Sequence, residues 1–130
     1  FQLYRHYLAV RHPGGGMDQS APEDFRTFLT SAWCNTRFYE ARLGKKLVAV
    51  AVTDEVSEGL SAVYTFFDPR LPERSLGTWA ILKQIQTARI ESLRWLYLGY
   101  WIEGCQKMAY KTRFRPHELR MADGIWQRNP

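Results

Sequence analysis

An almost continuous apolar run at residues 46–53, KLVAVAVT, constrains the fold of this chain more than any other feature. A run of this length, rich in β-branched valine, is typical of a central strand whose two faces are both buried. The run is far too short to cross a bilayer. We therefore expect a soluble domain built around this strand, with no membrane partner.

Two further strands are predicted directly beside this run. Residues 36–43 precede it across a tight turn at Gly44-Lys45, and residues 60–67 follow a turn around Glu58-Gly59. Such short connections join antiparallel neighbours. The sequence therefore predicts three consecutive antiparallel strands.

Helices are predicted before and after these strands in the sequence. Residues 1–11 have aromatic and apolar side chains at three- and four-residue spacing, and this pattern ends before His12. A second helix is expected to begin at a capping box formed by Ser20 and Glu23. Ser75 is expected to cap a third helix. Its apolar positions repeat at helical spacing and are Leu76, Trp79, Ala80, Leu82 and Ile85.

The strand at 60–67, the helix after Ser75 and a predicted strand at 94–100 form a β-α-β unit. The two strands of such a unit lie parallel with a right-handed connection, so the complete sheet should be mixed and mostly antiparallel. A short helix is predicted at 105–111, and one more strand after Pro116. This order resembles the acetyltransferase-like (GNAT) fold, an α/β (α+β) fold with flanking helices and two splayed parallel strands. We expect the whole 130-residue chain to form one such domain.

The charge and the cysteines of the chain favour a nucleic-acid partner and a reducing compartment. Eighteen Lys and Arg against thirteen Asp and Glu give a net charge of +5, which suits a polyanion, although a merely basic protein fits equally well. Cys34 and Cys105 form no disulfide framework, so we expect a cytoplasmic location. His6, His12 and His117 lack the spacing of metal ligands, and we expect no metal and no cofactor in this chain.

The loop at residues 74–80, RSLGTWA, partly resembles the R-x-x-G-x-G/A loop that binds the pyrophosphate of coenzyme A. Unpaired N–H groups at such a helix start suit a phosphate. Ser75 as a simple cap and Gly77 as a packing residue are the equally supported structural alternative. Trp79 stands where the coenzyme A loop has Gly or Ala, and this departure argues against coenzyme A.

Longer strings of residues resemble the C-terminal domain of arginyl-tRNA:protein transferases, and within that family the bacterial aspartate/glutamate leucyltransferases most. The resemblance extends from about residue 3 to 126. The strings that carry it are HPGGGMD at 12–18, GLSAVYTFFDP at 59–69, RSLGT at 74–78, LYLGYWI at 96–102, and Cys105 with Lys107-Met108, Tyr110-Lys111 and Phe114-Arg115-Pro116.

This resemblance implies transfer of leucine, or of arginine in the other branch, from charged tRNA to proteins that begin with Asp or Glu. In this N-end rule reaction the added residue marks the protein for degradation. Members of the family also carry a cysteine-bearing N-terminal domain, which we expect to be missing from this chain. A coenzyme A-dependent N-acetyltransferase and a non-catalytic RNA-binding fragment remain the alternatives.

Aminolysis of an aminoacyl ester needs positioning, a group that accepts the ammonium proton and donors for the oxyanion. The ends of the two splayed strands supply our catalytic candidates: Tyr64, Thr65 and Asp68 from one strand, and Tyr97 from the other. Asp68 precedes a proline, and a turn role is the stronger interpretation for it. The two tyrosines are core residues in the alternative interpretation.

The tRNA-binding candidates fall into three groups. Arg74, Ser75, Gly77 and Thr78 form the loop at the helix start. Tyr100 and Trp101 follow a strand end, where they could stack on a base or ribose, or pack as a buried aromatic pair. Three further cations lie in a stretch without acids and suit phosphate contacts, although a solvated basic face would look similar; these are Lys107, Lys111 and Arg113.

Overall fold

The computed structural model describes residues 1–17 and 20–129. Asp18, which belongs to the first string of the family resemblance, lies outside the described residues. The chain divides into two compact units, Phe1–Leu98 and Gly99–Pro130. Among the described residues, no helix combines the length and the apolar character that a bilayer crossing requires.

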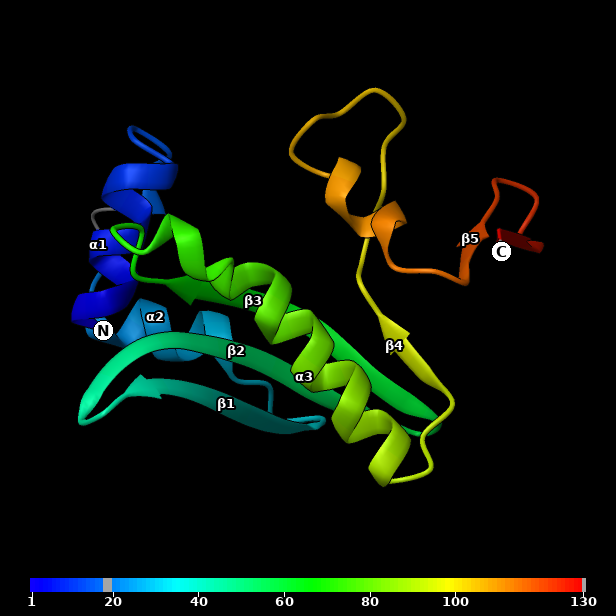
Figure 1. Ribbon diagram of the computed structural model, residues 1–130, viewed down its shortest axis with the longest axis horizontal. Coiled ribbons are helices and arrows are strands. Elements are labelled where there is room, and N and C mark those ends of the chain that lie inside the picture. Colours follow the sequence, from blue (N-terminus) through cyan, green and yellow to red (C-terminus); the bar gives the residue numbers. More distant parts are fainter. Residues whose placement is uncertain (18–19, 130) are drawn as a thin grey trace. The chain divides into compact units, whose positions relative to one another are not determined.

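The first unit contains a four-stranded sheet with the order β1-β2-β3-β4 (Figure 1). The strands are β1 (Asn35–Leu43), β2 (Lys46–Val56), β3 (Gly59–Phe67) and β4 (Trp95–Tyr97). The first three pair antiparallel, and β4 pairs parallel with β3. The apolar run lies in β2, whose middle is buried between its two neighbours. The predicted central strand and the mixed, mostly antiparallel sheet are therefore confirmed.

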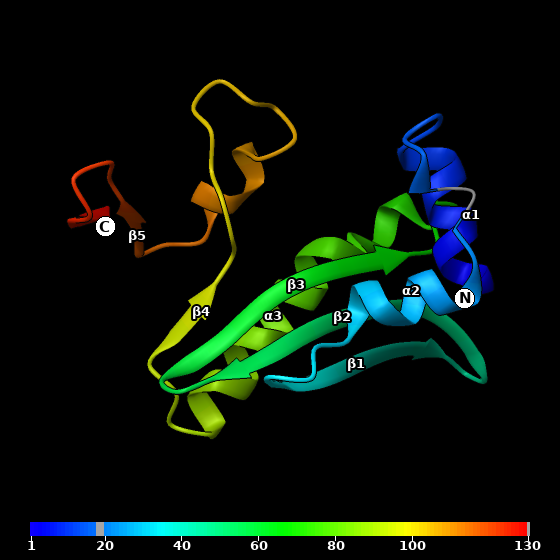
Figure 2. The ribbon, with the colours of Figure 1, turned by 180° about the vertical axis from the view of Figure 1, so that it is seen from behind.

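The strand predicted at 94–100 is much shorter in the structure. Only residues 95–97 pair with β3, opposite residues 59–61. Gly99 has φ +78°, which does not continue an extended strand. Beyond Ser61, β3 runs on to Phe67 past the end of β4 (Figure 2), so the two parallel strands share only the beginning of β3.

Helices cover both faces of the sheet. On one face, α1 (Gln2–Arg11) and α2 (Pro22–Leu29) bury Tyr4, Leu8 and Leu29 against β2 and β3. On the other face, α3 (Leu76–Ile90) packs through Leu76 and neighbouring residues. Figure 1 shows α3 in front of the sheet, and Figure 2 shows α2 in front of it. Alternate side chains of a strand point to opposite faces, so β2 supplies apolar side chains to both layers.

Two predicted helix caps differ from the structure. The second helix begins at Pro22 rather than after Ser20, because proline at the first helical position is already in helical geometry. The Asp24 carboxylate accepts the N–H of Ala21 at 3.0 Å in place of the predicted Ser20-Glu23 box. Ser75 occupies the cap position of α3 but forms no side-chain cap bond. Its φ of 46° is left-handed, whereas a capping hydroxyl needs an extended residue.

The second unit contains short elements. The helix predicted at 105–111 is replaced by a 3-10 helix, η3 (Ala109–Arg113). Gly104, with φ +76°, interrupts the chain just before the predicted helix. The tail forms an antiparallel hairpin of β5 (His117–Arg120) and β6 (Trp126–Asn129), so two strands occur where one was predicted.

Candidate functional site

In the first unit, β3 carries two of the predicted site residues, Tyr64 and Thr65, and is distorted just before them; Asp68 follows directly after its end. Val52 pairs with Tyr64 and Thr53 with Ala62, which leaves Val63 as an extra residue in a β-bulge. Bulges change the direction of the side chains that follow and are common next to active sites. The bulge lies just beyond the segment that pairs with β4.

Tyr64 lies in a cluster of aromatic rings on the face covered by α1 and α2. Its ring centroid is 5.4 Å from that of Phe28, 6.1 Å from Tyr4 and 6.3 Å from Tyr7. Burial, followed by the nearby Tyr7 and Tyr4, raises the pKa of Tyr64 well above its usual range. A tyrosine in this environment stays protonated and packs as a core residue, so it is poorly suited to accept a proton.

Asp68 is a buried anion whose oxygens are already bonded. Its carboxylate is 1% exposed and accepts Lys46 Nζ at 2.8 Å, Arg70 Nε and Nη2 at 2.8 Å, and the Arg70 N–H at 3.1 Å. The hydrogen bond from the Arg70 side chain, aided by Lys46, holds the pKa of Asp68 well below its usual range despite burial. A carboxylate that binds protons so weakly favours an anchoring role in the β3–α3 connection over catalysis.

Thr65 and Tyr97 differ from Tyr64 in their position on the sheet. Thr65 follows Tyr64 and points to the opposite face, which α3 covers. Tyr97 is 37% exposed and pairs with Ser61, so it lies roughly 13 Å along the strand direction from Thr65. The four catalytic candidates therefore occupy both faces and different points of the β3–β4 pair rather than one cluster.

The loop at residues 74–78 leads into α3 beside the end of β3. A 3-10 turn, η2 (Pro72–Arg74), precedes it, and both Arg74 and Ser75 are exposed. The N–H groups of a first helical turn lack partners within the helix and lie at its positive end. A side chain on Gly77 would begin 3.5 Å from Cε1 of Phe67, an ordinary contact distance. Space alone therefore does not demand glycine at this position.

The second unit holds the other tRNA-binding candidates. Tyr100 is 89% exposed, whereas Trp101 is only partly exposed. Lys107 and Arg113 are exposed, but Lys111 Nζ donates to the carbonyl of Tyr100 at 2.5 Å. Burial lowers the pKa of Lys111. Lys111 thus helps to hold this unit together, which its sequence context did not indicate.

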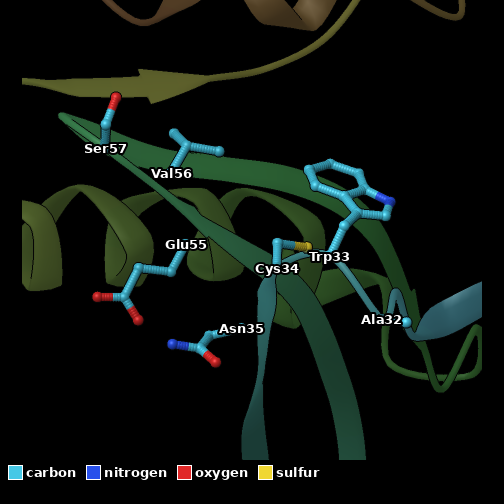
Figure 3. Close-up of a pocket in the computed structure, with 7 residues that line it drawn as sticks. All are labelled: Ala32, Trp33, Cys34, Asn35, Glu55, Val56 and Ser57. Atoms are coloured by element: carbon cyan, nitrogen blue, oxygen red, sulfur yellow. The ribbon is translucent and has the colours of Figure 1, made fainter.

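A pocket of about 520 Å³ that sequence analysis did not predict lies where β1 begins and β2 turns into β3 (Figure 3). The Trp33 side chain, 79% exposed, forms one wall, and Glu55 lines the pocket on the other side of Cys34. Burial and the neighbouring Asp54 raise the pKa of the Cys34 thiol, which disfavours the nucleophilic thiolate. Glu55 pairs with Arg37 at 3.0 Å. In the part of the chain that the structure describes, no three His, Cys, Asp or Glu side chains gather as metal ligands would.

Comparison with known proteins identifies relatives over almost the whole chain. A family model described as "Arginine-tRNA-protein transferase, C terminus" matches residues 1–121. A protein named aspartate/glutamate leucyltransferase from Alkalilimnicola ehrlichii is 57% identical over 120 residues, which cover 92% of this chain and 50% of that protein. A protein of the same name from Alcanivorax borkumensis is 52% identical over 127 residues, which cover 98% and 52% of the two chains. The chain thus spans about half the length of these curated relatives.

Proposed function

This chain belongs to the arginine-tRNA-protein transferase family, and on that basis we propose that the protein carrying it is an aminoacyltransferase. Its substrates are a charged tRNA and a protein whose first residue is Asp or Glu. The supporting observation is the 57% identity to a relative named aspartate/glutamate leucyltransferase, which also favours leucine as the transferred residue. The added leucine marks the acceptor for degradation under the N-end rule, and the use of charged tRNA supports a cytoplasmic location.

The reaction is aminolysis of an ester. The neutral α-amino nitrogen of the acceptor attacks the carbonyl carbon of the aminoacyl ester, and a carbon–nitrogen bond forms. The carbon–oxygen bond to the terminal ribose breaks, and the ribose oxygen leaves as a hydroxyl because it takes up the one proton that the attacking nitrogen loses, directly or through a nearby group. Because the ester is already activated, positioning of the two substrates supplies most of the acceleration.

The divergence of β3 and β4 supports an acetyltransferase-like arrangement for this reaction. The strands pair over only three residues each, and the rest of β3 continues towards the start of α3. In that fold the acyl donor lies between the splayed strands and at the helix start. We infer that the aminoacyl end of tRNA occupies this place. The family match crosses both compact units, which supports treating residues 1–130 as one catalytic domain, with aminoacyl-tRNA as co-substrate and no cofactor.

The predicted site residues take separate roles in this proposal. Thr65 and Tyr97 offer hydroxyl groups for proton transfer or oxyanion binding, while Tyr64 packs behind the strand and Asp68 anchors the loop before α3. The remaining candidates contact tRNA, through the helix start and through aromatic rings and cations of the second unit. They are Arg74, Ser75, Gly77, Thr78, Tyr100, Trp101, Lys107, Lys111 and Arg113.

The proposal is tested with the full-length protein, a peptide led by Asp, and leucyl-tRNA or arginyl-tRNA in parallel, with mass spectrometry of the peptide. We expect addition of one leucine. Addition of arginine alone would contradict the amino-acid assignment. Acetylation from acetyl-coenzyme A without tRNA would instead support an N-acetyltransferase. A peptide led by a neutral residue is the control, and it should remain unmodified.

A further inference from the structure

The guanidinium group of Arg11 is placed beside the proposed site by an aromatic ring. Arg11 is the last residue of α1, and its Cζ lies 5.6 Å from the centroid of the Phe67 ring. Phe67 is the last residue of β3, and its Cε1 is 3.5 Å from the point where a side chain on Gly77 would begin. One ring therefore separates Arg11 from the first turn of α3.

The Phe67 ring is itself held from the same helix. The ring of Tyr7 meets it edge-on, with centroids 5.0 Å apart, and Tyr7 also contacts His12 at 5.7 Å. Phe67 further packs against the buried cluster that contains Leu76. Contacts from α1 and from the α3 side therefore restrict the ring over which the Arg11 guanidinium lies.

Arg11 differs in its partners from Lys46 and Arg70, two other cations of this region. Lys46 and Arg70 both form ion pairs with Asp68, so their charges are already paired within the protein. Among the described residues no carboxylate forms an ion pair with Arg11, whose side chain is exposed. A guanidinium above a ring keeps its N–H groups available for a carboxylate in the two-bond geometry that arginine favours.

We propose that Arg11 binds the side-chain carboxylate of the acceptor's first residue, and so determines specificity for Asp and Glu. The inference rests on the proposed function, which requires the enzyme to distinguish a carboxylate from the amide of Asn or Gln. Shape cannot make this distinction because the groups are nearly isosteric, whereas a cation with two aligned donors can. Arg11 lies next to the start of α3, where the aminoacyl end of tRNA is proposed to bind.

The test compares full-length wild-type enzyme with Arg11→Gln and Arg11→Lys, using peptides led by Asp, Glu and Asn. In Arg11→Gln, KM for the Asp and Glu peptides should rise roughly ten- to a hundredfold, the loss expected for hydrogen bonds to a charged group. KM for leucyl-tRNA should not change. Arg11→Lys keeps the positive charge but lacks the paired donors. Its KM for the Asp and Glu peptides should lie between those of the wild type and of Arg11→Gln. Arg5→Gln, an exposed arginine on the same helix, is the matched control and should behave as wild type.

Calorimetry of the Asp peptide with each enzyme provides a second readout that does not depend on turnover, and far-ultraviolet circular dichroism verifies folding. Unchanged KM and affinity for the Asp peptide in a folded Arg11→Gln enzyme would overturn the assignment. So would a rise in KM for leucyl-tRNA alone, which would assign Arg11 to the donor. Absence of leucine transfer by the wild-type enzyme is a different result, because it refutes the proposed function itself.

Discussion

Gln84 Nε2 donates a 2.6 Å hydrogen bond to Oγ1 of Thr53, and both side chains are completely buried between α3 and β2. The bond joins the middle of the helix to the strand at the centre of the sheet. The Oε1 atom of Gln84 has no hydrogen-bond partner among the described residues. Burying these polar groups costs free energy, which their hydrogen bond partly offsets. Replacing one of the two side chains should therefore lower the free energy of unfolding more than replacing both.

The first prediction concerns this pair. Thr53→Val leaves the Gln84 amide without its acceptor and should lower the free energy of unfolding by about 1–3 kcal/mol. The double variant Thr53→Val, Gln84→Met should lose less than Thr53→Val alone, because no buried amide remains. Urea unfolding of both single variants, the double variant and the Thr53→Ser control completes the cycle. Additive losses would show that the two side chains are not coupled.

The second prediction concerns Gly59, where β3 and β4 begin to pair. A Cβ at this position would lie 2.4 Å from the carbonyl oxygen of Trp95, so the two strands would have to separate. Gly59→Ala should cost roughly 1–3 kcal/mol, as other overpacked substitutions do. Gly77→Ala, which meets only an ordinary contact, is the control and should be close to neutral in thermal unfolding. Equal midpoints for the two variants would contradict the close approach of the strands.

The third prediction follows from the lowered pKa of Asp68. Because the folded-state pKa lies below the unfolded value of about 4, ionised Asp68 stabilises the fold above that pH, and this contribution is lost as pH falls below it. Asp68→Asn should lower the free energy of unfolding at pH 7 by about 1.5–3 kcal/mol, and the difference should shrink in acid. The control Glu40→Gln breaks an exposed ion pair with Arg42 and should change the free energy of unfolding by less than about 1 kcal/mol. A constant difference between pH 7 and pH 2 would argue against the Asp68 assignment.

The fourth prediction tests the helix start as a site for the tRNA terminus. In the full-length enzyme, Gly77→Val should raise KM for charged tRNA roughly tenfold or more, since small displacements of a bound substrate are costly. KM for the acceptor peptide should stay the same. Gly77→Ala again serves as the control for folding and for the smaller side chain. Unchanged kinetics in a folded Gly77→Val enzyme would place the tRNA terminus elsewhere.

The fifth prediction separates the basic residues of the second unit. Lys107 and Arg113 are exposed and free to contact phosphates. The double variant Lys107→Gln, Arg113→Gln should therefore bind all tRNAs more weakly, and by about the same factor. The slope of log affinity against log salt concentration should fall by at most roughly 0.9 per lost phosphate contact. Lys111→Gln should also reduce thermal stability, because Lys111 holds the Tyr100 carbonyl. Salt titrations that overlay the wild type would exclude these cations from tRNA binding.

Sequence by itself determined the elements whose signals are local. The apolar run of β2, the helical spacing of α1 and the β-α-β order each reflect side chains a few residues apart, and the structure confirms them. The family could also be predicted from sequence, because long strings of residues carried that resemblance, and the match over residues 1–121 confirms it. Capping residues were less informative. Ser20 and Ser75 both have side chains that could cap a helix, but neither caps one in the structure.

Tertiary structure alone decided which distant side chains meet. Lys46 binds Asp68 from 22 positions away, Gln84 reaches Thr53 from 31, and Arg11 lies over Phe67 at the end of another element. It also decided that β4 ends at Tyr97 and that Tyr64 and Thr65 face opposite layers. These relationships depend on strand register and on how helices pack on the sheet. Register and packing are set by the sum of many weak contacts across the whole unit, which no short segment of sequence contains.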